Sequence, residues 1–355
     1  MGLKLNITAT SLMLLLASAA EVSCDTIFDV TKYAWGDACS SPVASTVMTP
    51  DGTCTRPNNH WRALQGSYQF HCPRQSGWIA FRQIDQFTLS GGGVFDGQGK
   101  TVWGTKCPSS AYCNQLPINL RFNFITNSMV KDITSRDSNQ FHIKLLGCKN
   151  LTFYNVAISA PEESLNTDGI HIGRSLGINI TYSTIETGDD CVSIGDGSEQ
   201  INMQRETCGP GHDISVGSLG NVKNCILTNT QNGVGVKTWP ASSHQGTASE
   251  MHFEDIVMNN VGNPIIIDQE YCPHIQCNLK IPSRIMLNDV SFRNIRGTTS
   301  TQVAVKLVCS QGVPREDVEL GDINLKYNGK EGHAMSQCKN IKPNLLGTQL
   351  PRTCA

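Results

Sequence analysis

Three polar residues, Asp168, Asp190 and His212, recur along the chain at one fixed interval of 22 positions. Each stands two residues before a short alternating apolar stretch, such as the one formed by Ile170 and Ile172. A chain that coils once per interval would stack these stretches as parallel strands about 4.7–4.9 Å apart. The interval therefore predicts a solenoid in which two carboxyl groups and an imidazole form one column, an arrangement suited to acid–base chemistry on a long, thin substrate.

Short apolar strands recur in two series that alternate along the chain, and Gly, Asn and Asp residues cluster between them, as turns require. Strands at this spacing without crossover helices favour an all-β parallel β-helix over a doubly wound fold. An antiparallel sandwich also has many short strands, but it does not require a repeat that stays in register over several coils. The first series is Ile143–Leu145, Ile170–Ile172, Val192–Ile194, Ile214–Val216, Val234–Val236, Ile265–Ile267 and Val303–Leu307, and the second is Leu151–Phe153, Ile178–Ile180, Ile201–Met203, Met251–Phe253 and Ile285–Leu287.

The composition fits this reading. The chain has 355 residues, of which 16% are charged and 32 are glycine. Few charges and many glycines are typical of a β-rich protein with many tight turns, since globular proteins usually carry roughly 25% charged residues. The net charge of −2 gives no basic face for nucleic acid. No stretch after the N-terminal segment is long and apolar enough to span a bilayer, so we expect neither nucleic acid nor a membrane as partner.

The N-terminal segment has the pattern of a secretory signal. Lys4 supplies a positive start, Leu12 to Ala17 form a short apolar centre, and small residues follow. Residues 1–24 are therefore expected to be removed, with cleavage after Ala20 or Cys24, and residues 25–355 to form a single domain. The mature protein would be secreted, and Asn150 and Asn179 would then be usable glycosylation acceptors.

Secretion favours disulfides over metal sites for the 15 cysteines. No Cys/His spacing resembles a zinc site, so no metal is expected. Sequence alone leaves the disulfide connectivity open. Three pairs suit the expected coils: Cys191 with Cys208 across adjacent coils, Cys272 with Cys277 around a small loop, and Cys338 with Cys354 at the C-terminus.

The alternation of the strands constrains the column. Asp168 shares parity with the inward Ile170, and an ionised carboxylate in that core would be very costly. The column must therefore lie at the start of the strands, where a turn breaks the alternation. Gly235 and Lys237, by contrast, have outward parity and should face the same groove directly.

Five short runs rich in polar and glycine residues occur along the predicted coils in a fixed order. The runs are Asn166-Thr167-Asp168, Gly188-Asp189-Asp190-Cys191, Cys208-Gly209-Pro210-Gly211-His212, Lys237-Thr238-Trp239-Pro240 and Ile267-Asp268-Gln269-Glu270-Tyr271. Together they resemble the plant polygalacturonases of glycoside hydrolase family 28, and most closely the pollen exo-acting type, from about Phe81 to the C-terminus. The resemblance implies a right-handed parallel β-helix with a cleft on one face. It also implies an extracellular, cell-wall enzyme that cleaves α-1,4 links between galacturonic acids with inversion and needs no cofactor.

The resemblance also implies a role for each site residue. Asp189 would be the general acid, while Asp168 and Asp190 would hold the attacking water, as an inverting glycosidase requires. His212 would orient and tune the acid. The substrate-binding residues would be Lys237, which would pair with a galacturonate carboxylate, Tyr271, which would line the subsite of the cleaved sugar, and Asn166. We expect a monomer that binds pectin or polygalacturonate. Rhamnogalacturonan hydrolysis on the same fold is a related alternative, but Lys237 and Tyr271 favour plain galacturonan.

The chain departs from the family pattern at several places. Gly235 stands where the family has an Arg that would bind a substrate carboxylate. Asp213 stands where the family has Gly; its parity against Ile214 is outward, so we expect it to face outward beside His212 and to repel an anionic substrate. The N-terminal cap after Tyr33 is shortened, and a strand and turn are expected to be missing before Asn221. These departures favour a second hypothesis, a pectin-binding homologue with impaired catalysis.

Overall fold

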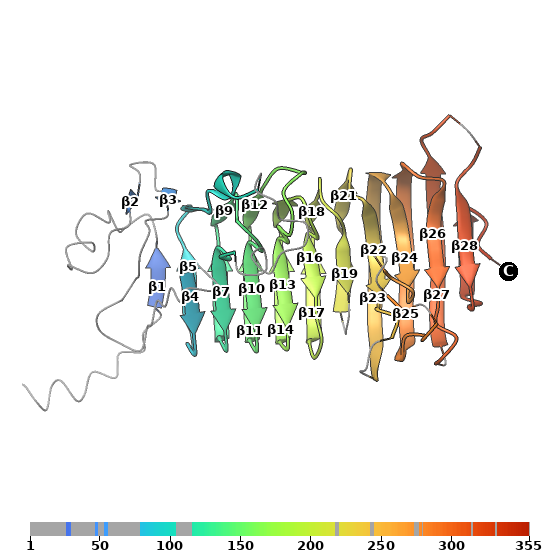
Figure 1. The fold of residues 1–355 in the computed structure, drawn as a ribbon, viewed down its shortest axis with the longest axis horizontal. Coiled ribbons are helices and arrows are strands. Elements are labelled where there is room, and N and C mark those ends of the chain that lie inside the picture. The colour runs from blue at the N-terminus through green and yellow to red at the C-terminus, as the bar shows by residue number, and fades with distance from the viewer. Residues whose placement is uncertain are drawn as a thin grey trace, which may run out of the picture.

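The protein is a long stack of coils with the N-terminal strands at one end and the C-terminus at the other (Figure 1). The computed structural model describes strands at 26–29, 47–48 and 53–55, and then residues 79–103, 116–216, 220–241, 245–272, 277–278, 280–313, 315–330 and 332–354. The predicted signal segment, its cleavage sites and the shortened cap lie outside the described residues. No helix in the described part of the chain is long and apolar enough to cross a membrane.

One strand of each coil belongs to a ten-stranded sheet, which carries the predicted column. All its strand pairs are parallel, so the predicted fold is confirmed and the sandwich is wrong. In order, its strands are β4 (Ile79–Arg82), β7 (Leu120–Asn123), β10 (Ile143–Leu146), β13 (Ile170–Gly173), β16 (Val192–Ile194), β19 (Ile214–Val216), β22 (Asn232–Lys237), β24 (Asn263–Asp268), β26 (Val303–Val308) and β28 (Met335–Lys339).

The remaining strands form a second, 19-stranded sheet, in which most coils contribute two strands and the late coils one long one. Only β2 and β3 pair antiparallel among the described strands. Its members are β1 (Thr26–Asp29), β2 (Val47–Met48), β3 (Thr53–Thr55), β5 (Phe87–Ser90), β6 (Val94–Asp96), β8 (Thr126–Lys131), β9 (Thr134–Arg136), β11 (Lys149–Tyr154), β12 (Ala157–Ser159), β14 (Leu176–Thr181), β15 (Thr184–Glu186), β17 (Glu199–Gln204), β18 (Thr207–Cys208), β20 (Gly220–Lys223), β21 (Ile226–Thr228), β23 (Gly246–Val261), β25 (Ile285–Thr299), β27 (Arg315–Tyr327) and β29 (Asn344–Leu350). The one described helical element is a 3₁₀ turn, η2 (Gly99–Thr101).

The 22-residue interval sets the register of the sheet. Ile170 pairs with Val192, and Val192 pairs with Ile214, so residues one interval apart lie side by side on neighbouring coils. These residues stack inside the solenoid with at most 1% of their surface exposed. Each such side chain contributes roughly 1.5–3 kcal/mol on burial, so the apolar ladders fix which residues of each strand face outward.

A sharp corner separates the two strands that most coils contribute to the larger sheet. The corner residue has a left-handed backbone, with φ between 51° and 61° at Asn155, Tyr182, Arg205 and Asn224. Asn tolerates this conformation better than most residues. The residue that follows each corner points inward, and the inward ladder there reads Val156, Ser183, Glu206 and Cys225, so one coil places a carboxyl group in the interior.

All three disulfides that the sequence left open are present: Cys191–Cys208, Cys272–Cys277 and Cys338–Cys354. The expectation of a missing strand before Asn221 is wrong. Strand β20 covers this position and pairs with both β17 and β23. Its first described residue, Gly220, lies opposite Ile201 of β17, so this coil keeps its place in the larger sheet.

Candidate active site

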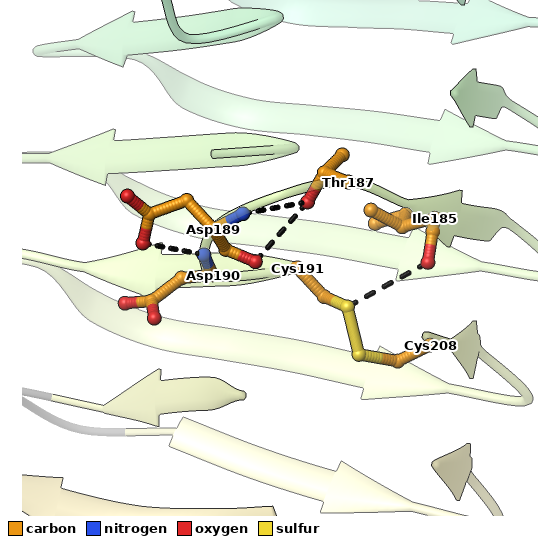
Figure 2. Close-up of a disulfide and its surroundings, with 6 residues drawn as sticks. All are labelled: Ile185, Thr187, Asp189, Asp190, Cys191 and Cys208. Carbon is orange, nitrogen blue, oxygen red and sulfur yellow. Dashed lines mark hydrogen bonds between the residues drawn. A yellow bond between two sulfur atoms is a disulfide. The ribbon is translucent and has the colours of Figure 1, made fainter. Parts of the chain in front are cut away.

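The candidate site lies on the loops that lead from the larger sheet into β13, β16 and β19. Asp189 and Asp190 sit on one such loop, where the Asp190 backbone N–H donates to Asp189 Oδ1 at 2.9 Å. The next residue, Cys191, is bonded to Cys208 of the following coil. Figure 2 shows both carboxyl groups on one side of this loop and the disulfide on the other, so the covalent link ties down the segment that presents the acids.

The side chain of Asp168 lies on the outer side of the sheet and not in the apolar core. Its Oδ2 accepts a hydrogen bond of 2.7 Å from Ser193 Oγ, on the outer side of β16, although Asp168 has the parity of the buried Ile170. The turn before β13 therefore breaks the alternation, as predicted. Burial raises the pKa of Asp168 to about 7, and the nearby charge of Asp189 acts in the same direction. The hydrogen bond from Ser193 lowers this pKa and so opposes both effects.

Two residues beside Asp168 were missed by sequence reasoning. Ser193 Oγ also lies 2.9 Å from His171 Nδ1, and burial lowers the pKa of His171 to about 4. The imidazole of His171 is therefore neutral, and the single hydroxyl hydrogen of Ser193 is donated to Asp168. His171 Nδ1 must then carry its own hydrogen and donate it to Ser193 Oγ. Both stand at the outward middle position of their strands, one interval apart, which is the signal that could have identified them.

Asp189 and His212 form the second pair of the site. His212 Nδ1 lies 2.9 Å from Asp189 Oδ1, and both side chains are partly exposed, at 41% and 21%. The hydrogen bond to Asp189 raises the pKa of His212, assisted by the charges of Asp189 and Asp213 and opposed by burial. The imidazole and the carboxyl group of this pair can therefore share a proton.

The third cluster joins Asp190, Asp213 and Lys237. Lys237 Nζ is 2.7 Å from Asp213 Oδ2 and 3.6 Å from Asp190 Oδ1. Burial disfavours the charge of Lys237, but the two carboxylates together raise its pKa. Burial also raises the pKa of Asp190, and Asp213 adds to this effect while Lys237 opposes it.

The structure corrects two expectations about this cluster. Asp213 was expected to face outward and to repel an anionic substrate from beside His212, but its side chain is 1% exposed and it is bound by Lys237 and by Asn232 Nδ2 at 3.1 Å. Lys237 was expected to face the groove directly, yet its side chain is only 9% exposed. The reason is that Lys237 reaches from one coil to a buried carboxylate on the coil before it.

Gly235 lies where β22 and β24 approach closely. A Cβ built there would overlap the Ile266 backbone carbonyl oxygen, so any side chain would force the two strands to shift. The neighbouring aromatic residues contact each other: Trp239 is 50% exposed and its ring lies 5.5 Å from that of Tyr271, in an edge-on arrangement. Lys237 Nζ lies 5.1 Å from the Tyr271 ring centre.

The structure thus brings together Asp168, Asp189, Asp190 and His212, with Lys237 and Tyr271 beside them. Asn166 lies exposed on the loop before Asp168, at φ 56°, and no hydrogen bond joins it to these acids within the described residues. A surface groove of about 640 Å³ runs along the same edge of the solenoid. Successive coils line it with Glu162, Gly188, His212, Gln231, Asn260 and Ser300.

One set of donors could hold a metal ion in the described part of the chain. Asp189, Asp190 and His212 each offer a ligand atom within 4.8 Å of the others. Two carboxylates and an imidazole suit several divalent ions. These are the same residues that supply acid–base groups, so metal binding and proton transfer would compete for them.

Comparison with known proteins assigns the family. The model of glycosyl hydrolases family 28 matches residues 43–350, so the chain belongs to this family of glycoside hydrolases. It is 46% identical to a polygalacturonase from Nicotiana tabacum, over 100% of this chain and 98% of that protein. It is 50% identical to an exopolygalacturonase from Oenothera organensis, over 91% and 96%.

A solved structure agrees with the fold. The endo-xylogalacturonan hydrolase of Aspergillus tubingensis superposes with a TM-score of 0.66 at 22% identity, covering 78% of each chain. This likeness supports the right-handed parallel β-helix that the sequence predicts. At this identity it bears on the fold alone.

Proposed function

We propose that this protein hydrolyses α-1,4 links between galacturonic acid residues of pectin, by an inverting mechanism and from the chain end. The observation that carries the proposal is the meeting of Asp168, the pair Asp189–Asp190 and His212 from three successive coils on one edge of the solenoid. The family and the polygalacturonases and exopolygalacturonases among its relatives support the substrate and the mode.

The proposed steps follow from the proton positions. Asp189 protonates the leaving glycosidic oxygen, and His212, whose pKa is raised by its bond to Asp189, returns a proton to it. Asp168 and Asp190 hold a water molecule that attacks the anomeric carbon from the opposite face and that gives up its proton to them. A direct attack by water with the acid on the other face inverts the configuration.

The two water-holding carboxyl groups must be ionised to act as bases. Burial raises the pKa of Asp168 to about 7 and also raises that of Asp190. The fraction of active protein should therefore rise with pH across the acidic range, until His212 loses its proton. No step needs a metal ion or a cofactor.

A second candidate function is pectin binding without cleavage. The observation that favours it is the pairing of Lys237 with Asp213, together with the absence of a side chain at Gly235, because both remove contacts for a substrate carboxylate. Such a protein would keep the groove and the fold but would stabilise the transition state poorly.

One experiment separates these functions. Purified mature protein is incubated with polygalacturonate and with pectin, and the release of reducing ends is compared with that of an Asp189→Asn variant. We expect release by the wild type alone, with monomer as the product if attack is from the chain end and mixed oligomers if it is internal. No release above the variant, with retained binding of oligogalacturonate, would support the binding protein instead.

The proposed substrate lies in the extracellular wall, which agrees with the predicted signal segment at 1–24. The acceptor Asn150 supports this setting because it is exposed at the start of β11, with a left-handed backbone, although its Nδ2 donates to Asn127 Oδ1 at 3.0 Å. Asn179 is partly exposed in the middle of β14, where its Oδ1 accepts a hydrogen bond from Asn202. We therefore expect secretion as a monomer, with a glycan at Asn150 favoured over one at Asn179, and mass spectrometry of the secreted protein would test both.

A further inference from the structure

The charge of Lys237 is already balanced inside the protein. Its ammonium group contacts Asp213 at 2.7 Å and Asp190 at 3.6 Å, and the side chains of all three residues are at most 14% exposed. A charge-assisted bond between partly buried groups is short and strong, so it is not given up readily for a ligand. A substrate carboxylate would have to displace Asp213 and leave that buried carboxylate without its cation, which is strongly unfavourable.

In the described part of the site, the other cationic group, His212, is also paired, with Asp189 at 2.9 Å. Four carboxyl groups, Asp168, Asp189, Asp190 and Asp213, surround one lysine and one histidine. None of the residues lining the groove beside His212 is a lysine or arginine, within the residues that the structure describes. The other cations on the strands of this sheet are on other coils, at Arg82, Arg121 and Lys144 before the acids and at Lys306 and Lys339 after them. Lys306 is paired with Asp268 at 2.7 Å, and Lys339 with Glu270 at 2.6 Å.

The surface next to Lys237 is aromatic rather than cationic. Trp239 exposes half of its surface and lies against Tyr271. Indole and phenol rings favour contact with apolar groups such as methyl groups and with the C–H faces of sugars. A hydrated carboxylate would lose solvation there without gaining a partner.

We infer that Asp213 determines which sugar binds beside Lys237 and the catalytic acids. Because Asp213 occupies Lys237, this position favours a methyl-esterified galacturonic acid over the free acid. The ester is neutral, it does not compete for Lys237, and its methyl group can pack on Trp239. The preferred substrate is therefore one that carries the ester at this sugar. The inference rests on the proposed function for its substrate class, and the ester itself takes no part in the reaction.

Binding tests the inference apart from cleavage. In an Asp189→Asn background, which prevents turnover, calorimetry measures the affinity for the galacturonic acid trimer and for its methyl ester. Adding Asp213→Asn keeps the shape of the side chain but removes the closest anionic partner of Lys237, so that only Asp190, at 3.6 Å, remains beside its ammonium group. We expect affinity for the free acid to rise about 10- to 100-fold, which is the worth of a hydrogen bond to a charged group, and affinity for the ester to change by less than about twofold. Asp213→Gly should act in the same direction.

A matched control removes a different paired and buried carboxylate. Asp96 accepts from Arg136 at 2.7 Å on the larger sheet, and Asp96→Asn should leave both affinities unchanged. The inference is overturned if Asp213→Asn raises the affinity for the free acid and for the ester equally, or raises neither. Hydrolysis by the wild type distinguishes the two proposals. If the expected binding pattern is found but nothing is cleaved, the proposed hydrolase function is refuted and the role of Asp213 stands. If the substrate is cleaved but Asp213→Asn has no selective effect on binding, the role of Asp213 is refuted and the hydrolase function stands.

Discussion

Glu206 offers a direct test of how the interior of the solenoid tolerates a carboxyl group. The residue is 2% exposed, and Oε2 accepts one hydrogen bond of 3.2 Å from the Ser183 backbone N–H. Oε1 has no hydrogen-bond partner. Burial raises the pKa of Glu206 to about 8, from 4.5 in a solvated chain, with only the Ser183 bond opposing it.

The pH dependence follows from this difference. Below about pH 4.5 the carboxyl group is protonated in both the folded and the unfolded chain, so its titration costs nothing. Between about pH 4.5 and 8 the unfolded chain releases the proton while the folded chain keeps it, so the folded state loses about 1.4 kcal/mol per pH unit. Over this range of roughly 3.5 units the loss reaches about 5 kcal/mol, and above about pH 8 it stays constant.

We therefore expect Glu206→Gln to leave stability near pH 4.5 almost unchanged and to increase it markedly near pH 8.5. Urea unfolding at the two pH values measures this, and the midpoint difference between variant and wild type should grow by about 1 M from the lower to the higher pH. Glu186→Gln, which alters an exposed carboxylate on β15, is the matched control and should show no such growth. Equal midpoint shifts at both pH values would refute the assignment of a neutral, buried Glu206.

Three further predictions concern the site. Asp213→Asn should move the acidic limb of the pH profile of kcat/KM to lower pH. The reason is that the variant lacks a charge that raises the pKa of Asp190, and Lys237 then has Asp190 as its one remaining carboxylate partner. An unmoved limb would contradict this. Ser193→Ala should move the same limb to higher pH, because the lost hydrogen bond had lowered the pKa of Asp168, so a shift in the same direction as Asp213→Asn would be the refuting result. Trp239→Ala should raise KM about 5- to 10-fold with little change in kcat, as expected for the loss of an aromatic contact, and a fall confined to kcat would exclude a stacking role.

The sequence predicted the parts of the structure that depend on period and parity. The 22-residue interval specifies both the parallel stacking and the register, because apolar residues must align on the interior of every coil. The cost of an inward carboxylate was enough to place Asp168 on a turn, and its contact with Ser193 confirms that position. The three disulfide pairs were among the pairings that the sequence left open, and the structure contains all three.

The contacts of long side chains were not predictable in this way. Lys237 spans from β22 to Asp213 on the loop before β19, and parity says only that a side chain starts outward, not where four flexible carbons end. The close approach of β22 and β24 at Gly235 depends on backbone positions that no pattern of residue types encodes. Glu206 stands among corner positions that alternate between apolar and small polar residues, so its burial required the coordinates.

The two departures at Gly235 and Asp213 act on the same lysine. In the family pattern that the sequence resembles, an Arg and this Lys would face a substrate carboxylate with no Asp between them. Here one cation is missing, and an internal carboxylate holds the other, so the polar contacts of Lys237 are complete before any ligand arrives. Restoring the Arg alone would not reverse the change, because its Cβ would press on the Ile266 carbonyl oxygen and Asp213 would still hold Lys237. Removing the charge of Asp213 takes away the closest anionic partner of Lys237 without moving a strand, so position 213 has the greater control over which sugar the acids can receive.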